Sequence, residues 1–573
     1  MSATTTGNAA PPAATADSAA SAMFRTLEDW GADRVFICPG STEAAFLDAS
    51  LSHPGVDLVL TTHEAVTVSA ADAYARLTGR PGVAYVHTHV GLTNGLAHLY
   101  CAQLERSPVV VITGLKATGL QGAIPGFLTT PDTAGLARPF TKWAHATGST
   151  ATIAGDLDHA LRVATTIPRG PTFLGIAQDF FDARGPVELP QGPGRASARV
   201  RPDPAVIAQV AERLAAAHCP LIVAGSEVFS AGAGALAAVN ALADLLGAPV
   251  ALEDRRSVDR ADVSGLGAYA GVFDARSDVA LETDLIFLAG SRAPIRFEEA
   301  APPSLPPGTP VIHLSEDAHE LTQGPAGSLP VLGDPELALT DLRVALAAAL
   351  DGPSEEVLRF RAFATAAYGD RVEQLRAGAE ELAGAQPIRV PALMHRLCRA
   401  LPAGTHVVDD SVTSKSALID HALVQDAGLR YVTTGGGSLG WAMGAAVGVA
   451  LARPGERIVS VVGDGVFQFG IPALWTAVDR QLPITFVVVN NRGYGAVKAA
   501  LQRFDGDAAA SERYPTTSLA GPDLAAVGSG FGTTAARVED LAQLPEALAR
   551  ASADPGPGVI EVLADPTDMG PLR

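Results

Sequence analysis

The sequence predicts an α/β protein built from three doubly wound, parallel-sheet domains. Three stretches of the chain alternate short apolar segments with Ala-rich segments of helical character, a pattern typical of a parallel sheet covered by helices on both faces. Two seams rich in proline, glycine or charge separate these stretches. A chain of 573 residues is also too long for a single hydrophobic core.

The first domain is predicted over residues 21–183. Residues 1–20 contain neither Lys nor Arg and no apolar core, so they do not form a secretory signal and are expected to be a disordered tail. Residues 184–204, rich in Pro, Gly and Arg, are the predicted linker that follows. Strands are expected at RVFICPG, GVDLVLT, GVAYVHT, PVVVITG and GPTFLGIA, which are residues 34–40, 55–61, 82–88, 108–114 and 170–177.

The second and third domains are predicted over residues 205–350 and 387–573. Residues 351–386, where a Pro/Gly break meets a charged helical stretch, are the linker between them. Middle-domain strands are expected at residues 220–226, 248–253, 284–290 and 309–315, and third-domain strands at residues 405–411, 457–465, 484–491 and 558–564.

The composition argues against several classes of protein. A net charge of −20 disfavours nucleic-acid binding, which requires clustered Lys and Arg. No apolar run reaches about 18 residues without polar interruption, so no transmembrane helix and no membrane partner are expected. The cysteines lie far apart without a CxxC pair, as expected for reduced thiols in a cytoplasmic protein; they are Cys38, Cys101, Cys219 and Cys398.

One pair of motifs in the third domain predicts a bound cofactor. Gly463-Asp464-Gly465 ends an apolar strand, and 24 residues separate it from Asn490-Asn491 at the end of the next. Both ends emerge at the same edge of a parallel sheet, the usual ligand side. Their side-chain oxygens suit Mg²⁺, and the helix start after Gly465 offers N–H groups to a phosphate. Each motif alone is also compatible with an ordinary strand-end turn.

At this spacing the pair resembles the cofactor signature of thiamine diphosphate (ThDP) enzymes. Further stretches resemble the benzoylformate decarboxylase branch of the pyruvate-decarboxylase-type family: CPGSTEAAFLD with Ser41, THEAVTVSAADAY with Glu64, VHTHVGLTNG with His87, and FLTTPDTAGLARPFTKWA. The resemblance covers nearly the whole chain. It implies a pyrimidine-binding domain, a middle domain and a diphosphate-binding domain, in that order.

The resemblance assigns roles to individual residues. Glu64 would protonate the aminopyrimidine of ThDP, although a carboxylate favoured by a helix N-terminus is an alternative interpretation. His87 and Ser41 would be the other catalytic residues. Ser41 lacks a nucleophile elbow, which argues against a serine hydrolase. Mg²⁺ would be bound by Asp464, Asn491 and the Gly493 carbonyl. Leu439 would be a wedge that bends ThDP, and Val466 would contact the cofactor at a position where family members have a small contact residue. The remaining cofactor contacts would be Gly437, Ser411, Thr413, Gly463, Gly465, Asn490 and Tyr494.

Two departures from that branch concern the substrate pocket, which would include Gly40. The branch's second histidine is replaced by Phe297, and its pocket aromatic residues by Ala499 and Ala500. Both changes point away from plain benzoylformate. The smaller alanine side chains imply a larger or differently shaped pocket, and the missing histidine argues against simple aldehyde release. His89 is expected to alternate with His87 on one strand and so to face away from the cofactor.

The resemblance implies a ThDP- and Mg²⁺-dependent 2-oxo acid decarboxylase that acts through a ylid and an enamine, with carboligation as a further outcome. The alternative is a carboligase or lyase of 2-hydroxy carbonyl compounds. A flavin-containing relative, such as an acetolactate synthase or pyruvate oxidase, and a catalytically silent scaffold are more distant alternatives. The resemblance also implies a homodimer or homotetramer with active sites at subunit interfaces. The expected partner is a small 2-oxo acid or carbonyl substrate.

Overall fold

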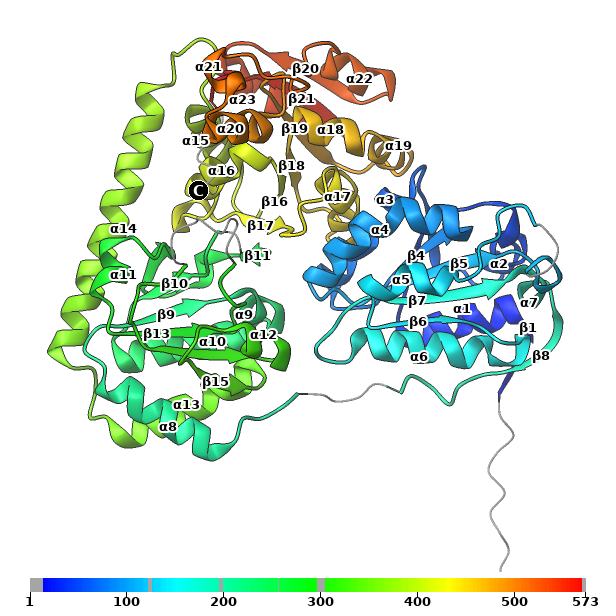
Figure 1. The fold of residues 1–573 in the computed structure, drawn as a ribbon, viewed down its shortest axis with the longest axis horizontal. Coiled ribbons are helices and arrows are strands. Elements are labelled where there is room, and N and C mark those ends of the chain that lie inside the picture. The colour runs from blue at the N-terminus through cyan, green and yellow to red at the C-terminus, as the bar shows by residue number, and fades with distance from the viewer. Residues whose placement is uncertain (1–13, 122–125, 195–198, 256, 296–303, 569–573) are drawn as a thin grey trace, which may run out of the picture. The chain divides into compact units, whose positions relative to one another are not determined.

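The computed structural model describes residues 14–121, 126–194, 199–255, 257–295 and 304–568 (Figure 1). The chain divides into two compact units, Met1–Ser197 and Ala198–Arg573. The first unit contains one parallel sheet, and the second contains two, so the predicted class of three doubly wound α/β domains is confirmed.

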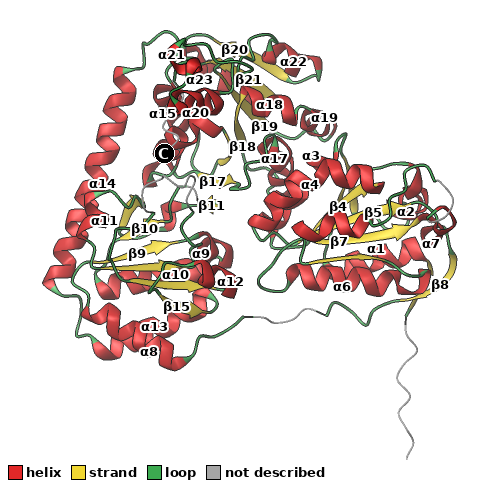
Figure 2. Cartoon of the chain, in the orientation of Figure 1, coloured by secondary structure: helices red, strands yellow, loops and turns green. Residues whose placement is uncertain are grey.

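The first unit is built on a parallel sheet of order β3-β2-β4-β5-β7-β6. Its strands are β2 (Arg34–Cys38), β3 (Asp57–Leu60), β4 (Gly82–His87), β5 (Val109–Leu115), β6 (Trp143–Ala146) and β7 (Thr172–Ala177). Its helices are α1 (Ala19–Trp30), α2 (Ala44–Ser50), α3 (Glu64–Thr78), α4 (Thr88–Leu104), α5 (Thr133–Ala137), α6 (Ile153–Thr165) and α7 (Gln178–Phe181). Helices α3 and α4 cover one face and α1 and α6 the other (Figure 2). All five strands expected in this domain are confirmed.

Besides β6 of the parallel sheet, two short strands outside that sheet were not predicted. Strand β1 (Thr15–Ser18) pairs antiparallel with β8 (Arg184–Glu188), partnering Ala16 with Val187. The first lies within the residues predicted as a tail, and the second lies within the predicted linker. The reason is physical: these strands are short, and only Ala16 and Val187 bury apolar side chains, so little periodicity marks them in the sequence.

The middle domain has a parallel sheet of order β12-β10-β9-β13-β14-β15. Its strands are β9 (Pro220–Ala224), β10 (Val250–Leu252), β12 (Tyr269–Val272), β13 (Leu285–Ala289), β14 (Val311–Ser315) and β15 (Leu329–Leu332). Its helices are α8 (Pro204–Ala216), α9 (Ser226–Ala231), α10 (Ala233–Leu246), α11 (Asp278–Glu282), α12 (Ala318–Gln323) and α13 (Pro335–Ala349). The four predicted strands are confirmed. Most of the predicted linker after this domain is the long helix α14 (Glu355–Glu381).

The third domain has a sheet of order β11-β17-β16-β18-β19-β21-β20. Its own strands are β16 (His406–Asp410), β17 (Arg430–Thr433), β18 (Ile458–Gly463), β19 (Ile484–Asn490), β20 (Thr534–Val538) and β21 (Gly558–Leu563). Its helices are α15 (Val390–Ala400), α16 (Lys415–Ala422), α17 (Trp441–Ala452), α18 (Asp464–Gly470), α19 (Pro472–Asp479), α20 (Gly495–Phe504), α21 (Asp507–Ala510), α22 (Leu524–Gly530) and α23 (Leu544–Ala553). Strand β11 (Arg260–Ala261) comes from the middle domain and pairs antiparallel with β17.

Candidate active site

Predicted site residues of the first unit gather at the carboxyl edge of its sheet. Strands β2 and β4 are neighbours, so the loop after Cys38 lies beside His87, the last residue of β4. Glu64 is the first residue of α3, directly after the His63 side chain accepts the Ala65 N–H at 3.1 Å and begins the helix. This edge is where ligands bind in open α/β sheets.

Glu64 is held by groups from two other elements. Its Oε2 accepts a hydrogen bond from Asn94 Nδ2 of α4 at 3.1 Å. Gly91 leaves room for the carboxylate, since a Cβ there would lie 2.9 Å from Glu64 Oε1. Cys38 donates its thiol to Glu64, and burial together with this carboxylate raises the pKa of the Cys38 thiol to about 12. Glu64 therefore has both a helix N-terminal position and a defined orientation.

His87 is held by a buried carboxylate that sequence reasoning missed. Its Nδ1 lies 3.1 Å from both Oε1 and Oε2 of Glu43, a residue with no exposed surface. Glu43 Oε2 also accepts the Gly40 N–H at 2.6 Å. The ring packs directly on Gly40, where a Cβ would lie 2.2 Å from His87 Nδ1. Gly40 thus makes room for the imidazole, and Glu43 fixes its orientation.

The structure corrects the expectation for His89. Strand β4 ends at His87, and Thr88 takes a left-handed backbone conformation (φ 51°) as the first residue of α4. His89 therefore lies in the first turn of a helix and does not alternate with His87 on a strand. Ser41 begins a short 3-10 turn, Ser41–Glu43, and its side chain is exposed.

The GDG motif of the second unit is a strand-to-helix turn. Strand β18 ends at Gly463 and α18 begins at Asp464, which is buried. Asp464 accepts the Gly465 N–H on Oδ1 at 2.8 Å and the Gly493 N–H on Oδ2 at 2.9 Å. Burial raises the pKa of the Asp464 carboxyl, while these N–H donors lower it. A Cβ at Gly465 would lie 2.8 Å from the Tyr494 ring, so a larger residue would not fit there.

The two asparagines at the end of β19 have different environments. Asn491 Oδ1 accepts the same Gly493 N–H, at 3.1 Å, so the side-chain oxygens of Asp464 and Asn491 converge on one atom. Asn490 donates its amide to buried Glu561 at 2.6 Å and accepts the Arg492 N–H at 2.9 Å. Asn491 could therefore hold a cation together with Asp464, while Asn490 supports the turn.

A second loop of this unit carries Gly437 and Leu439. Gly437 is exposed and has a positive φ of 64°. The loop is fixed by Asp410, whose Oδ2 accepts the Gly440 N–H at 3.0 Å. Burial and the neighbouring Asp409 raise the pKa of Asp410 to about 8, against the lowering effect of N–H donors from Gly440 and Ala442. Asp410 was not predicted as a site residue because an acidic residue at the end of a strand, followed by Ser, is typical of a polar turn.

The remaining predicted cofactor contacts differ in their burial and in whether their polar groups already have hydrogen-bond partners. Thr413 is half-buried and lies against Gly495, where a Cβ would be 3.3 Å from Thr413 Cγ2. Ser411 is buried, and its hydroxyl donates to Asp409 Oδ1 at 2.6 Å, so this group already has a partner. Val466 is buried in the first turn of α18.

The predicted pocket alanines lie on α20. Ala499 is half-buried and Ala500 exposed. The residue before Ala499 is Lys498, whose ammonium lies beside Gly493, since a Cβ at Gly493 would be 3.0 Å from its Nζ. Phe297, predicted to replace a family histidine, lies outside the described residues.

Comparisons with known families decide what this architecture is. The first unit matches the N-terminal TPP binding domain of thiamine pyrophosphate enzymes over residues 17–137. The central domain of the same family matches residues 207–342, and its C-terminal TPP binding domain matches residues 414–562. The chain belongs to the thiamine pyrophosphate enzymes. The predicted resemblance to ThDP-dependent enzymes is therefore confirmed.

This thiamine pyrophosphate enzyme is similar to members with different names. It is 28% identical to benzoylformate decarboxylase of Pseudomonas aeruginosa over 95% of this chain and 98% of that enzyme. It is 27% identical to the large subunit of acetolactate synthase isozyme 3 of Escherichia coli over 84% of this chain and 83% of that subunit. The crystal structure of benzoylformate decarboxylase from Polynucleobacter necessarius has the same fold, with a TM-score of 0.81 at 23% identity, covering 96% of this chain and 99% of that one.

In the part of this enzyme that the structure describes, no helix is long and apolar enough to cross a membrane. Cys38, Cys101, Cys219 and Cys398 form no disulfide in the described structure.

Proposed function

We propose that this enzyme is a ThDP- and Mg²⁺-dependent decarboxylase of 2-oxo acids. The observation that supports this proposal most directly is the convergence of Asp464 Oδ2 and Asn491 Oδ1 on the Gly493 N–H. Two hard oxygens from different strand ends, close to one glycine turn, suit an ion that prefers oxygen ligands and phosphate partners. Two similar proteins are named benzoylformate decarboxylase and acetolactate synthase, and both names describe chemistry at a carbonyl carbon.

The metal would be held by Asp464, Asn491 and the Gly493 carbonyl. Among the described residues no cluster of three or more His, Cys, Asp or Glu side chains could hold a metal, which fits a site made of one carboxylate, one amide and a main-chain oxygen. The first turn of α18 adds N–H groups for phosphate oxygens. Lys498, beside Gly493, adds a positive charge near the same turn.

When bound, ThDP supplies a nucleophilic carbon and stabilises the negative charge left on the substrate carbon after CO₂ departs. Glu64 would hold a proton at an aminopyrimidine nitrogen, a role that needs a carboxyl group of fixed orientation. Asn94 and Cys38 provide that orientation, and the glycine at position 91 provides the space.

His87 and Ser41 would act on the substrate. The Glu43 carboxylate faces His87 Nδ1, so Nδ1 carries the proton in that contact and Nε2 remains to accept or deliver one. The exposed Ser41 hydroxyl is free to donate to a substrate carboxylate. A residue pair of this kind moves a proton at the reacting carbon or its oxygen.

A second outcome, carboligation, is favoured by the small side chains of α20. Ala499 and Ala500 leave space that a second carbonyl substrate could occupy. The sequence also has Phe297 where the resembling branch has a histidine, and phenylalanine cannot deliver a proton. We therefore expect a 2-hydroxy ketone to be a substantial share of the product when an aldehyde acceptor is present.

One assay tests both outcomes. The enzyme with ThDP and Mg²⁺ is incubated with a panel of aryl and alkyl 2-oxo acids, with and without acceptor aldehydes, and CO₂ and organic products are measured by mass spectrometry. CO₂ release from none of the acids would overturn the decarboxylase proposal. Aldehyde as the sole product across the acceptor panel would overturn the carboligation part. A Phe297→His variant is expected to shift the product ratio toward free aldehyde.

We also propose a homodimer or homotetramer that acts in the cytoplasm. The four free, widely separated thiols are typical of a reducing compartment. Several large apolar side chains near the candidate cofactor loops are exposed, as they would be in one subunit of a larger assembly; they are Val412, Phe469, Val497 and Phe504.

A further inference from the structure

The middle domain has the topology of a nucleotide-binding sheet. From β9 the chain passes outward through β10 to β12 and then returns to add β13, β14 and β15 on the other side of β9. The strand order therefore reverses between β9 and β13. In open α/β sheets the crevice at such a point, outside the carboxyl ends of the strands, is where dinucleotides bind.

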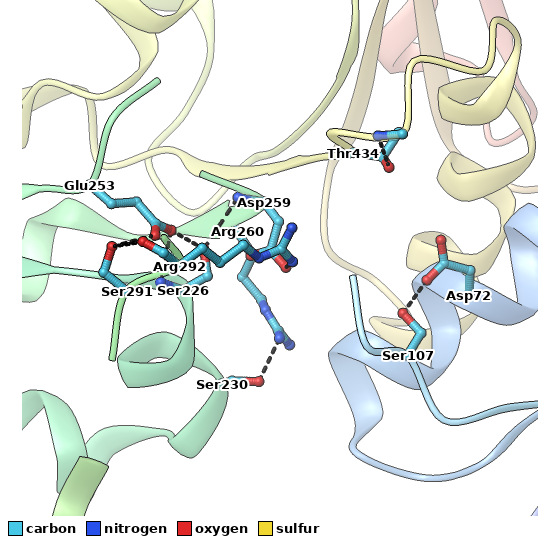
Figure 3. A network of polar contacts seen from close by, with 11 residues as sticks. Asp72, Ser107, Ser226, Ser230, Glu253, Asp259, Arg260, Ser291, Arg292 and Thr434 are labelled. Carbon is cyan, nitrogen blue, oxygen red and sulfur yellow. Dashed lines mark hydrogen bonds and ion pairs between the residues drawn. The ribbon is translucent and has the colours of Figure 1, made fainter. Parts of the chain in front are cut away.

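In this enzyme a buried carboxylate occupies the crevice. Glu253, directly after β10, is 1% exposed and reaches across the end of β9. Its Oε1 accepts the Ser226 N–H at 2.8 Å and also the Ser226 hydroxyl. Its Oε2 accepts the hydroxyl of Ser291, which follows β13, at 3.2 Å (Figure 3). One side chain thus satisfies donors on both sides of the reversal point, where a pyrophosphate would accept them.

A second carboxylate fills the next position along the same edge. Glu227 Oε1 accepts the Ser315 hydroxyl at 2.7 Å, and its Oε2 accepts the Glu316 N–H at 3.0 Å. Ser315 is the last residue of β14, and Glu316 directly follows it. Glu227 also donates its own N–H to the Gly290 carbonyl at 3.0 Å, which joins the loops after β9 and β13.

The two loops are in direct contact as well. A Cβ at Gly225 would lie 2.2 Å from Ser291 Cα and 2.3 Å from the Gly290 carbonyl oxygen. No pyrophosphate can pass between backbones that lack room for a methyl group. This closure rests on main-chain contacts, so a change of side-chain rotamer does not open it.

The same polar network continues into the third domain. The Asp259 N–H donates to Ser226 Oγ at 3.3 Å, and its carboxylate accepts from buried Arg292 at 3.3 Å. The Asp259 carbonyl then accepts the Thr433 N–H at 2.8 Å, at the end of β17. The next residues, Arg260 and Ala261, are strand β11, which pairs with β17. The loop with Gly437 and Leu439 follows directly after β17.

We propose that the chain itself fills this crevice. Glu253 and Glu227 take the hydrogen bonds that a dinucleotide would make, so neither a flavin nor a nucleoside diphosphate binds there. The same network anchors β11 to the sheet of the ThDP-binding domain. The flavin-containing alternative is thereby disfavoured by geometry. The closure of this crevice does not depend on which substrate the enzyme uses.

Ligand titration tests the closed crevice. FAD and ADP are each added to the full-length protein with ThDP and Mg²⁺ at saturation, so that ADP cannot enter the diphosphate site. No saturable binding is expected up to about 1 mM, a limit equivalent to roughly 4 kcal/mol of binding free energy. Saturable binding that protects residues 225–228 and 290–292 from hydrogen exchange would overturn the proposal. Binding without that protection would place the nucleotide elsewhere and leave the crevice closed.

Hydrogen exchange tests the anchor. In Glu253→Ala the exchange of peptides covering residues 259–261 and 431–433 is expected to rise by about tenfold or more, because the loss of the carboxylate frees Ser226 and Asp259. Glu212→Ala, an exposed glutamate of α8, is the matched control and should leave these peptides unchanged. Should Glu253→Ala fail to fold, Ser226→Ala removes one contact and should give a smaller change of the same sign. Unchanged exchange in folded Glu253→Ala or Ser226→Ala protein would overturn the anchoring role.

Discussion

Glu64 combines a catalytic assignment with a fixed environment. Glu64→Gln keeps the size and can still face Asn94 and Cys38, but it removes the acid that would donate a proton to the cofactor. We expect kcat to fall by about 100-fold or more while ThDP still binds, since general acid–base groups contribute about 10²–10⁴-fold. Steady-state kinetics and calorimetric ThDP titration measure the two effects separately.

Asp29→Asn, a change of an exposed carboxylate on α1, is the matched control and should leave kcat unaltered. A Glu64→Gln enzyme that turns over at the wild-type rate would show that Glu64 is only a helix N-terminal carboxylate.

Glu43 is the clearest example of a site residue that was not predicted from the sequence. Glu43→Gln preserves volume but replaces one of the two oxygens that face His87 Nδ1 with an amide donor. The ring then keeps one acceptor but loses the second oxygen and the negative charge, so we expect kcat to fall about tenfold with little change in ThDP affinity, as for other residues that orient a catalytic group. If the variant instead loses thermal stability and ThDP affinity together with kcat, Glu43 only supports the fold.

The elements show where sequence reasoning succeeds and where it fails. Strands such as β4, β5 and β19 were predicted because they are buried on both faces and read as continuous apolar runs. Edge strands β6 and β20 were missed because their side chains are half-exposed and leave no such run. The GDG turn and the end of β19 were predicted correctly because glycine, aspartate and asparagine directly follow buried strands.

The same limit applies to the residues that support the site. Glu43 and Asp410 act through hydrogen bonds to backbone or imidazole groups that are distant in sequence or in another element. No spacing encodes such contacts. His89 was misassigned because a left-handed Thr88 ends β4, a conformation for which the Thr side chain gives no warning.

The GDG element makes a prediction about the metal. Asp464→Ala removes one of two converging oxygens, and we expect Mg²⁺-dependent ThDP affinity to fall by about 100-fold or more, at the upper end of losses seen for groups around a metal. Because Asp464 also accepts two N–H groups of the turn, Asp464→Asn is the companion variant that keeps a side-chain acceptor and removes the charge.

Calorimetry with and without Mg²⁺ measures the effect, and Asp479→Ala at the exposed end of α19 is the control. Unchanged ThDP affinity in both Asp464 variants would mean that GDG is an ordinary turn.

At the scale of the whole molecule, we expect at least a dimer. Each subunit has a mass of 58.6 kDa, and exposed side chains such as Phe504 (82%) and Phe469 (60%) are costly to leave in water. Light scattering during size-exclusion chromatography should give at least twice the subunit mass in active fractions. An active species of 58.6 kDa at assay concentration would contradict the proposed assembly.

Stability of the second unit should depend on pH through His421. Its ring lies 5.0 Å from that of His395, and burial, His395, Arg376 and Arg371 lower the pKa of His421 to about 4 from 6.5. The unfolded chain therefore takes up the proton first as the pH falls. Stability attributed to the neutral ring is complete above about pH 6.5 and is lost progressively down to about pH 4.

Between pH 7 and pH 5 this linkage amounts to about 1–2 kcal/mol, allowing for some solvent screening. His421→Gln removes the titration, so its urea-unfolding midpoint should shift less than the wild-type midpoint over that range. Parallel shifts in the two proteins would rule out His421 as the group responsible.

The antiparallel pairing of β1 with β8 gives the first unit a property of its own. Thr15 partners Glu188, so the chain enters and leaves this folded body at the same place, through adjacent strands. A body whose two ends meet can be excised, inserted into another chain or permuted without stretching its connections. A cut in the connection after β8 would therefore leave intact all the sheet pairings among the described residues of this N-terminal TPP-binding unit.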